Sequence, residues 1–342
     1  MKNPSEIIHV VLAVYDPDGS YSRHAGVVMV SIFERTKSPV CVHVLHDKTL
    51  TEHNRSLLTE TAETFAQTVE FHDVSPYIER LGEDAVKLAR KKWASEGILF
   101  RLAIPNILLL DKVIYLDCDI VVNLDIRELW DTPMEGYSLA GALDTRHSRF
   151  SSTSFRMRLM GCDWEKYVNS GVLLMSLPQI KEKLTIQKSA SWYKRYRHCV
   201  KYPDQDLINS CFRGDIKIID GRFNNRDLVK TFYCGAIASC IVHVTPTKPW
   251  KDLKGSIADR LYWKTFLKTP WGRLAPEGIV DLLFDVVEKS PLTHRKSVQC
   301  YRTILYRLRK DVIRNDVVVI LWLLATELSS KAKFFFTRRE PQ

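Results

Sequence analysis

The first third of the chain alternates short apolar runs with longer amphipathic stretches. Residues 8–14 form an almost unbroken apolar run, and residues 40–45 form a second one. Such runs are typical of strands that are buried on both faces of a parallel sheet. The pattern predicts a helix over residues 25–34. Because this connection is short, we expect the two strands to be parallel.

A third strand is predicted over residues 69–74, where apolar and polar side chains alternate. A helix that opens at residues 51–55, with Thr49 or Thr51 as its N-cap, connects it to the second strand. The resulting βαβαβ order is the pattern of a nucleotide-binding, doubly wound half. No GxGxxG motif follows the first strand, which argues against a dinucleotide-dependent dehydrogenase.

Two aspartates accompany the next apolar run. Residues 97–110 have helical spacing that Pro105 kinks or breaks, and residues 113–122 predict a buried strand that carries Asp117 and Asp119 near its end. Side chains at i and i+2 of an extended chain point the same way, so both carboxylates can face one divalent cation. Oxygen ligands suit Mg²⁺ or Mn²⁺. An isolated DxD motif is more often an ordinary strand end. Here the apolar residues before it would be buried and would leave two carboxylates crowded at the end of the strand. Such a pair is costly unless a cation neutralises it, which favours a cation site.

The composition is that of a folded protein with an excess of basic residues. Its 342 residues, 45% hydrophobic and 26% charged, are enough for one large α/β domain with an appendage. Fifty Lys+Arg against 40 Asp+Glu give a formal charge of +10, which favours an anionic partner. No stripe of aromatic residues interleaves the basic ones, so nucleic acid is not expected as that partner.

The composition changes near residues 273–290. We therefore expect a catalytic domain over residues 1–272 and a basic, helical C-terminal region over residues 273–342. Within this region, residues 317–325 are apolar, and basic residues such as 307–310 flank them. A bilayer span needs about 20 apolar residues, which this run does not reach. Two interpretations stay open: a helix that lies on an anionic membrane surface, and a helix that packs in a core.

The cysteines and the N-terminus indicate the cellular compartment in which the protein is expected. The eight cysteines are dispersed without a CxxC pair, and we interpret them as buried thiols in a reducing cytoplasm. Zinc binding is the alternative, but the close cysteine spacing of structural zinc sites is absent from the sequence. The N-terminus lacks a long apolar run, so no secretory signal is expected. The expected location is the cytoplasm. The membrane-surface interpretation of the C-terminal region would add peripheral attachment to the inner face of the membrane.

Five separated segments resemble glycosyltransferase family 8, in the order of that family. These retaining enzymes include lipopolysaccharide galactosyl- and glucosyltransferases and glycogenin. The segments are residues 100–102, 112–119, 167–175, 203–209, and His243 with 248–250. The resemblance extends from residue 6 to the region of residue 272. It implies an α/β fold of the nucleotide-diphospho-sugar transferase (GT-A) type, with a Rossmann-like mixed sheet and a helical C-terminal extension.

The resemblance also implies a metal site and a catalytic pair. Asp117, Asp119 and His243 would together bind Mn²⁺, or Mg²⁺, and an imidazole nitrogen is compatible with such a carboxylate site. Without the resemblance, His243 would be expected to be a core or strand-edge histidine. Gln205 and Asp204 resemble the pair beside the reacting carbon, with Gln205 placed to stabilise positive charge there.

The donor-binding residues implied by the resemblance come from the whole length of the catalytic domain. Arg101 would contact the donor near the metal, Asp144 would hold sugar hydroxyls, and Lys248 would reach the β-phosphate as a point charge. The full set comprises Tyr15, Asp16, Tyr21, Arg101, Asp117, Cys118, Asp119, Asp144, Asn169, Ser170 and Lys248.

The implied activity is transfer of galactose or glucose from a UDP-sugar to a saccharide acceptor, such as a lipopolysaccharide, a lipooligosaccharide or a glycoprotein glycan. Two segments depart from the family pattern. Residues 244–247 lack the glycine that the family usually has there, and residues 15–21 form a longer loop that contains Pro17. These departures motivate an alternative, a catalytically impaired nucleotide-sugar-binding protein. A metal-dependent phosphohydrolase built on the same carboxylates is a third hypothesis.

Overall fold

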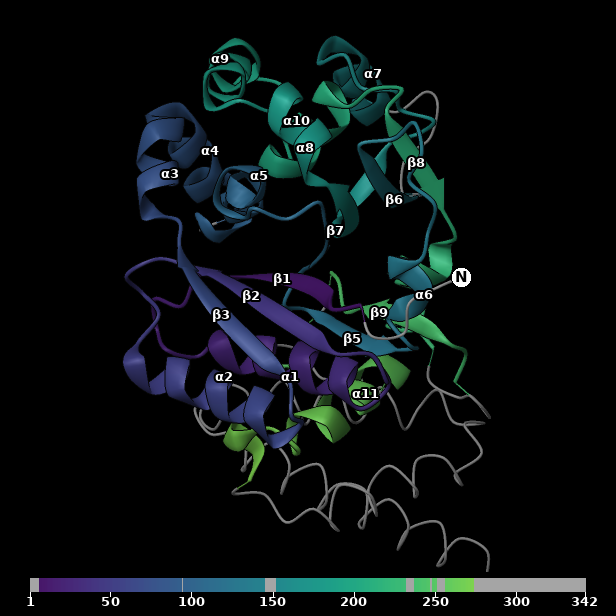
Figure 1. The fold of residues 1–342 in the computed structure, drawn as a ribbon. Helices are drawn as coiled ribbons and strands as arrows, with labels where there is room; N and C mark the ends of the chain where they lie inside the picture. The colour runs from purple at the N-terminus through teal and green to yellow at the C-terminus, as the bar shows by residue number, and fades with distance from the viewer. Residues whose placement is uncertain are drawn as a thin grey trace, which may run out of the picture. The chain divides into compact units, whose positions relative to one another are not determined.

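The computed structural model describes residues 6–93, 95–144, 152–231, 237–246, 248–250 and 256–273 (Figure 1). The chain divides into two compact units. The first comprises Met1–Asn225 and Ser239–His243, and the second comprises Arg226–Ala238 and Val244–Gln342. The predicted basic helical region over residues 273–342, with its proposed membrane contact, lies outside the described residues apart from Arg273. The boundary at residue 272 therefore stays a prediction.

The first unit is built on a mixed sheet, as the sequence predicts. Among the described residues, seven strands follow the order β3-β2-β1-β4-β7-β6-β8, and two more, β5 and β9, form a two-stranded sheet. The first four strands of this order are parallel, whereas β7 is antiparallel to both β4 and β6. The strands are β1 (Ile8–Val14), β2 (Val40–His46), β3 (Thr68–Asp73), β4 (Lys112–Leu116), β5 (Ile120–Asn123), β6 (Leu139–Leu143), β7 (Val168–Ser176), β8 (Ile216–Ile219) and β9 (Cys240–His243).

Helices cover both faces of the β1–β3 part of the sheet. In Figure 1, α1 and α2 lie on one side of these strands, and α3, α4 and α5 lie on the other. The helices of the first unit are α1 (Ser22–Phe33), α2 (Glu52–Thr64), α3 (Ser75–Leu81), α4 (Glu83–Trp93), η1 (Gly97–Ala103), α5 (Ile104–Ile107), α6 (Arg127–Trp130), α7 (Ser152–Leu159), α8 (Leu177–Lys183), α9 (Ile186–Tyr196), α10 (Pro203–Cys211) and η2 (Gly221–Asn224). The second unit contains α11 (Ile257–Phe266) and η3 (Pro270–Gly272).

The predicted βαβαβ half is confirmed. β1 is buried throughout except at His9, because it lies between β2 and β4 and helices cover both sheet faces. α1 begins at Ser22 rather than at residue 25. The side chain of Thr51 caps α2 by accepting a hydrogen bond from the backbone N–H of Asn54 at 3.2 Å. The other candidate cap, Thr49, instead accepts a hydrogen bond from a backbone N–H of the first loop.

The prediction of one strand over residues 113–122 is wrong. β4 ends at Leu116, the chain turns through residues 117–119, and β5 begins at Ile120 in the other sheet. Aspartate favours such turns because its short carboxylate accepts hydrogen bonds from nearby backbone N–H groups. Asp117 and Asp119 are therefore brought to the same place by a turn at the carboxyl end of β4, and not by alternation along an extended strand.

Residues 97–110, for which the sequence predicts a helix kinked or broken at Pro105, contain two short helices. The structure has the short helix η1 over Gly97–Ala103 followed by α5 over Ile104–Ile107. Pro105 lies in the first turn of α5, where the N–H that proline lacks has no helical partner to lose. The proline therefore starts a helix here.

No helix among the residues that the structure describes is both long enough and apolar enough to cross a membrane.

Candidate active site

The acidic turn after β4 meets the last residue of β9. β9 pairs with β5, and this pairing sets His243 opposite Ile120, the residue that follows the turn. His243 Nε2 lies 3.3 Å from Asp119 Oδ1 and 3.9 Å from Asp117 Oδ2. One candidate ligand atom from each of the three residues lies within 4.8 Å of the other two. The structure therefore brings together the three residues that the sequence predicts as metal ligands.

The first half of β7 runs directly beside this cluster. The backbone N–H of Asp117 donates to the carbonyl of Gly171 at 2.9 Å, which continues the pairing of β4 with β7 into the turn. A Cβ atom on Gly171 would lie 2.4 Å from His243 Cε1 and 2.8 Å from Asp117 Oδ2. Side chains do not tolerate such distances, so only glycine lets β7 approach the carboxylate and the imidazole this closely.

The hydrogen bonds of His243 fix the nitrogen that faces the carboxylates. His243 Nδ1 lies 2.8 Å from Asn224 Oδ1. Asn224 uses its Nδ2 to donate to Asn169 Oδ1 at 2.9 Å, so its oxygen is the atom that accepts from the imidazole. The proton of a neutral His243 is therefore on Nδ1. Its Nε2 lone pair points toward the carboxylates, as a metal ligand requires.

Three amides link His243 to Asp144. Beyond Asn224, Asn169 Nδ2 donates to Gln205 Oε1 at 3.0 Å, and Gln205 Nε2 donates to Asp144 Oδ2 at 3.3 Å. We call Asn224, Asn169 and Gln205 the amide relay. Backbone N–H groups of β7 orient two of its members, because Gly171 N donates to Asn169 Oδ1 and Ser170 N donates to Gln205 Oε1. The predicted donor-sugar and catalytic residues thus share one buried network with the metal cluster.

Arg101 ties the acidic turn to the start of α10. Its Nη2 donates to Asp117 Oδ1 at 2.7 Å, and its Nε lies 3.1 Å from Asp204 Oδ2. Its Nη1 donates to the carbonyl of Ser170 at 2.6 Å, and its guanidinium lies over the ring of Tyr115. Burial alone would lower the pKa of Arg101, but the two carboxylates raise it above its ordinary value. The guanidinium is a permanent positive charge beside the metal cluster.

Asp204 is held on both sides. Its Oδ2 accepts a hydrogen bond from Ser170 Oγ at 2.8 Å and faces Arg101. Burial raises the pKa of Asp204, while Arg101 acts in the opposite direction. The carboxylate lies in the first turn of α10, which begins at Pro203, and a helix N-terminus favours a negative charge there. Asp204 therefore orients Arg101 and Ser170.

The first loop is organised around Asp16. Its carboxylate is buried and accepts hydrogen bonds from Tyr21 N, Ser22 Oγ and Asn54 Nδ2. Tyr15 packs edge-on against Phe100, with 6.2 Å between the ring centroids. Asp16 thus holds the loop that presents Tyr15 and Tyr21. Direct contact of these three residues with a nucleotide stays a prediction.

Two further donor-binding residues predicted from the sequence are Cys118 and Lys248. The thiol of Cys118 is buried and donates to the carbonyl of Ala13 in β1 at 3.3 Å, and burial raises its pKa far above the ordinary value. Any contact of Cys118 with a donor would therefore involve its backbone. Lys248 belongs to the second unit, and its contact with a diphosphate stays a prediction.

Sequence reasoning missed three residues that shape this site. Asn224 orients His243, and no spacing or motif around it signals that role. The hydroxyl of Tyr115 donates to Asp117 Oδ1 at 2.8 Å, although the residue reads as one more apolar position of β4. Asp206 is fully buried and accepts from Tyr167 OH at 2.5 Å and from Arg156 Nη1 at 2.6 Å. Asp206 lies inside the segment 203–209, and this position is the signal that could have predicted it as a site residue.

The residues of the cluster fit a divalent cation. Two carboxylates that lie close together repel each other unless a positive charge is shared between them, and here the facing Nε2 of His243 is a lone-pair donor. Two oxygen ligands and one imidazole nitrogen suit Mn²⁺ or Mg²⁺ better than a soft metal. When bound, such an ion would neutralise the charge of a diphosphate.

We predict that Asn224→Ala weakens Mn²⁺ binding about 10- to 100-fold, the usual effect of losing the group that orients a metal-ligating histidine. Free Mn²⁺ measured by electron paramagnetic resonance during a titration gives the affinity. Asn224→Asp is the matched variant, since its carboxylate still accepts from His243 Nδ1 although it cannot donate to Asn169. It should recover most of the affinity. Equal affinity in Asn224→Ala and the unmodified protein would exclude the orienting role.

Comparisons with known proteins place this chain among sugar-transferring enzymes. Residues 13–254 match the family described as Glycosyl transferase family 8. A Haemophilus influenzae protein, named by inference as a glycosyltransferase, is 28% identical over 249 residues, which is 69% of this chain and 72% of that protein. The lipopolysaccharide 1,2-glucosyltransferase of Escherichia coli K12 is 28% identical over 204 residues, covering 55% of this chain and 59% of the enzyme.

A solved structure confirms the fold. The crystal structure of the galactosyltransferase LgtC, in complex with donor and acceptor sugar analogues, superimposes with a TM-score of 0.64 at 23% sequence identity. The match covers 77% of this chain and 96% of that chain. At this identity the likeness establishes the fold, and the predicted GT-A type architecture is confirmed.

Proposed function

Because this chain belongs to glycosyl transferase family 8, we propose that it transfers glucose or galactose from a UDP-sugar to a saccharide acceptor, with Mn²⁺ or Mg²⁺ bound by Asp117, Asp119 and His243. One observation carries the proposal: this cluster and the amide relay form a single buried network that ends on Asp144. Such a network would fit the diphosphate and the hexose of a nucleotide-sugar donor.

Different side chains would contact different parts of the donor. The bound cation supplies neutralisation of the charge that develops on the departing diphosphate. Arg101 adds a fixed positive charge, and Lys248 adds a second by the family resemblance. Asp144 would accept hydrogen bonds from sugar hydroxyls, and Asn169 would contact the sugar through its amide. Because Arg101, Asp144 and Asn169 are buried and water is largely excluded from them, their charges and dipoles act more strongly than they would in solvent.

We favour retention of configuration through attack by the acceptor on the same face as the leaving group. The departing diphosphate oxygen would then take the acceptor hydroxyl proton. A double displacement would need a free nucleophile, but Asp204 is buried, faces Arg101 and accepts from Ser170 Oγ. The amide oxygen of Gln205 is weakly basic and accepts from Asn169 Nδ2 and Ser170 N. Gln205 would thus stabilise charge at the anomeric carbon without forming a bond to it.

Gln205→Ala is expected to reduce turnover about 100-fold without abolishing it, because it removes one group that stabilises the transition state and breaks the amide relay. Release of UDP from UDP-glucose and UDP-galactose under saturating Mn²⁺ measures the change. Intact-protein mass spectrometry is the second readout. A hexose covalently trapped on Asp204 in the variant would refute same-face attack.

The acceptor is proposed to be a saccharide on lipid or protein, with lipopolysaccharide or lipooligosaccharide favoured. The name of the Escherichia coli relative, a lipopolysaccharide 1,2-glucosyltransferase, supports this choice. Cytoplasmic location and attachment to the inner face of the membrane through residues 273–342 stay predictions.

The deciding experiment incubates the full-length protein with UDP-glucose or UDP-galactose, Mn²⁺ and a panel of saccharide acceptors, with and without EDTA. The expected result is an acceptor heavier by one hexose, with UDP as the second product and no reaction in EDTA. Binding of the UDP-sugar without turnover would identify an impaired nucleotide-sugar-binding protein. Release of inorganic phosphate in place of UDP would identify a phosphohydrolase.

A further inference from the structure

A second group of metal-ligating side chains lies away from the active site, on the β1–β2 part of the sheet. His9 pairs with Cys41 across the two parallel strands, and His43 is two residues further along β2. Since side chains alternate along a strand, all three project from the same sheet face. His9 and Cys41 are near the amino ends of their strands, whereas the acidic turn follows the carboxyl end of β4.

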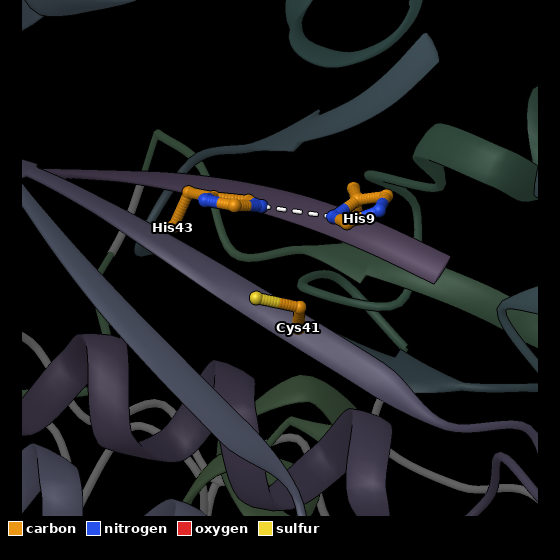
Figure 2. A group of neighbouring side chains, drawn as sticks. All are labelled: His9, Cys41 and His43. Carbon is orange, nitrogen blue, oxygen red and sulfur yellow. Dashed lines mark hydrogen bonds between the residues drawn. The ribbon is translucent and has the colours of Figure 1, made fainter. Parts of the chain in front are cut away.

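The three side chains converge on one point. His9 Nδ1 lies 3.0 Å from His43 Nε2, and one ligand atom of each residue, including Cys41 Sγ, lies within 4.8 Å of the other two. Figure 2 shows the two imidazoles facing each other across neighbouring strands, with the thiol below them. Zinc–nitrogen bonds of about 2.0–2.1 Å in a tetrahedron put two nitrogen ligands roughly 3.4 Å apart, which is close to the separation seen here.

The other nitrogen of His43 already has the partner that a metal-ligating histidine needs. His43 Nδ1 lies 3.3 Å from Glu70 Oε2 and 3.1 Å from His72 Nε2, both of which can accept its proton. A carboxylate at this position fixes the tautomer and leaves Nε2 as a lone-pair donor toward His9 and Cys41. His43 and Cys41 are 3% and 5% exposed.

We propose that His9, Cys41 and His43 form a second metal site that takes a borderline-soft divalent ion of the zinc class. The donor set decides this class: a thiolate and two imidazoles select zinc-like ions, whereas the two carboxylates and one imidazole of the active site suit Mn²⁺ or Mg²⁺. The thiol of Cys41 loses its proton to solvent when the sulfur–metal bond forms. The ion would join β1 to β2 at the end of the sheet that lies away from the acidic turn.

No linear sequence motif predicts this site, because its ligands come from two strands, at positions 9, 41 and 43. Without an ion, the histidines of this group form a hydrogen-bonded ladder in which His43 bridges His9 and His72. A second group, His43 with Glu70 and His72, shares the histidine through its other nitrogen and contains no sulfur. Sulfur ligation therefore distinguishes the proposed site from both of these arrangements and from the active site.

The test is a Co²⁺ titration of the full-length, chelator-treated protein. The expected result is a near-ultraviolet thiolate-to-cobalt band that saturates at about one equivalent, since the proposal gives the protein one site with a thiolate ligand. Cys41→Ser should abolish the band, whereas Cys162→Ser, which removes another buried thiol, should leave it unchanged. Glu70→Gln should keep the band with weaker affinity. A band that survives in Cys41→Ser, or no band at all in the unmodified protein, would overturn the proposal.

A second measurement needs no variant and so does not depend on the folding of Cys41→Ser. Zinc-edge X-ray absorption of the unmodified protein loaded with one equivalent of Zn²⁺ should show one sulfur and two imidazole nitrogens around the metal. Thermal unfolding should shift upward on Zn²⁺ addition in the unmodified protein and in Cys162→Ser, but not in Cys41→Ser. A zinc shell without sulfur would assign the ion to the other groups and refute the site.

Discussion

Gly171→Ala is expected to lower Mn²⁺ affinity and turnover by about 100-fold or more, although the change adds one methyl group outside the ligand set. The added Cβ would lie 2.4 Å from His243 Cε1, 2.9 Å from His243 Nδ1 and 2.8 Å from Asp117 Oδ2. These atoms cannot all retreat, because Asn224 holds His243 Nδ1 while the backbone N–H of His243 donates to Asn225 O at 2.8 Å. The methyl group must therefore separate the imidazole from the carboxylate.

Gly141→Ala is the matched control for this substitution. Gly141 lies in β6, the strand that pairs with β7, and its added Cβ would meet the apolar side chains of Leu173 and Val168 at 3.2 Å. Both variants should lose about 1–3 kcal/mol of folding stability through overpacking. Only Gly171→Ala should lose metal affinity, measured by Mn²⁺ titration at a temperature where both are folded. Equal metal affinity in the two variants would show that β7 does not set the geometry of the cluster.

Asp119→Asn is expected to reduce turnover about 1,000-fold, equivalent to roughly 4 kcal/mol of lost transition-state stabilisation. The side chain of Asp119 is 8% exposed and its Oδ1 faces His243 Nε2 at 3.3 Å. The amide is nearly isosteric but uncharged, so it neutralises less of the positive charge of a cation and binds it more weakly. Activity that remains should be insensitive to EDTA, because the ion would contribute little to it.

The metal-free form of Asp119→Asn gives a readout that a general loss of folding cannot imitate. Removing one of two adjacent carboxylates relieves their repulsion, so thermal unfolding without metal should occur at the same or a higher temperature than in the unmodified protein. Asp163→Asn, which neutralises an aspartate of a surface turn, controls for the loss of charge alone. The account of the cluster fails if Asp119→Asn binds Mn²⁺ as tightly as the unmodified chain does.

Local pattern was sufficient to predict the first three strands and the helices between them. The strands that contain residues 8–14 and 40–45 are buried on both faces because helices cover both faces of the sheet, and their continuous apolar composition reflects this burial. The turn at Asp117 escaped the same reasoning, because residues on both sides of it are equally apolar. Only the partners differ, β7 for one strand and β9 for the other, and a linear pattern does not contain partners.

The candidate ligands were predictable by resemblance, but the groups that orient them were not. His243 reaches the acidic turn only because β9 pairs with β5, a contact between segments far apart in the chain. Asn224 depends on that same pairing, and nothing in its neighbourhood marks it. The group formed by His9, Cys41 and His43 was likewise invisible, since a search for closely spaced cysteines does not find ligands that are neighbours across two strands.

The hydrogen bonds of the amide relay all run one way. His243 donates to Asn224, Asn224 to Asn169, Asn169 to Gln205, and Gln205 to Asp144, which as a carboxylate only accepts. A carboxylate at any of the three amide positions, Asn224, Asn169 or Gln205, would face the next residue of the chain as a second acceptor, with no proton between the two oxygens. Divergence toward another sugar is therefore constrained at these residues. We expect lineages of this fold to change their sugar preference by remodelling the surrounding loops, while the direction of the chain of amides is inherited intact.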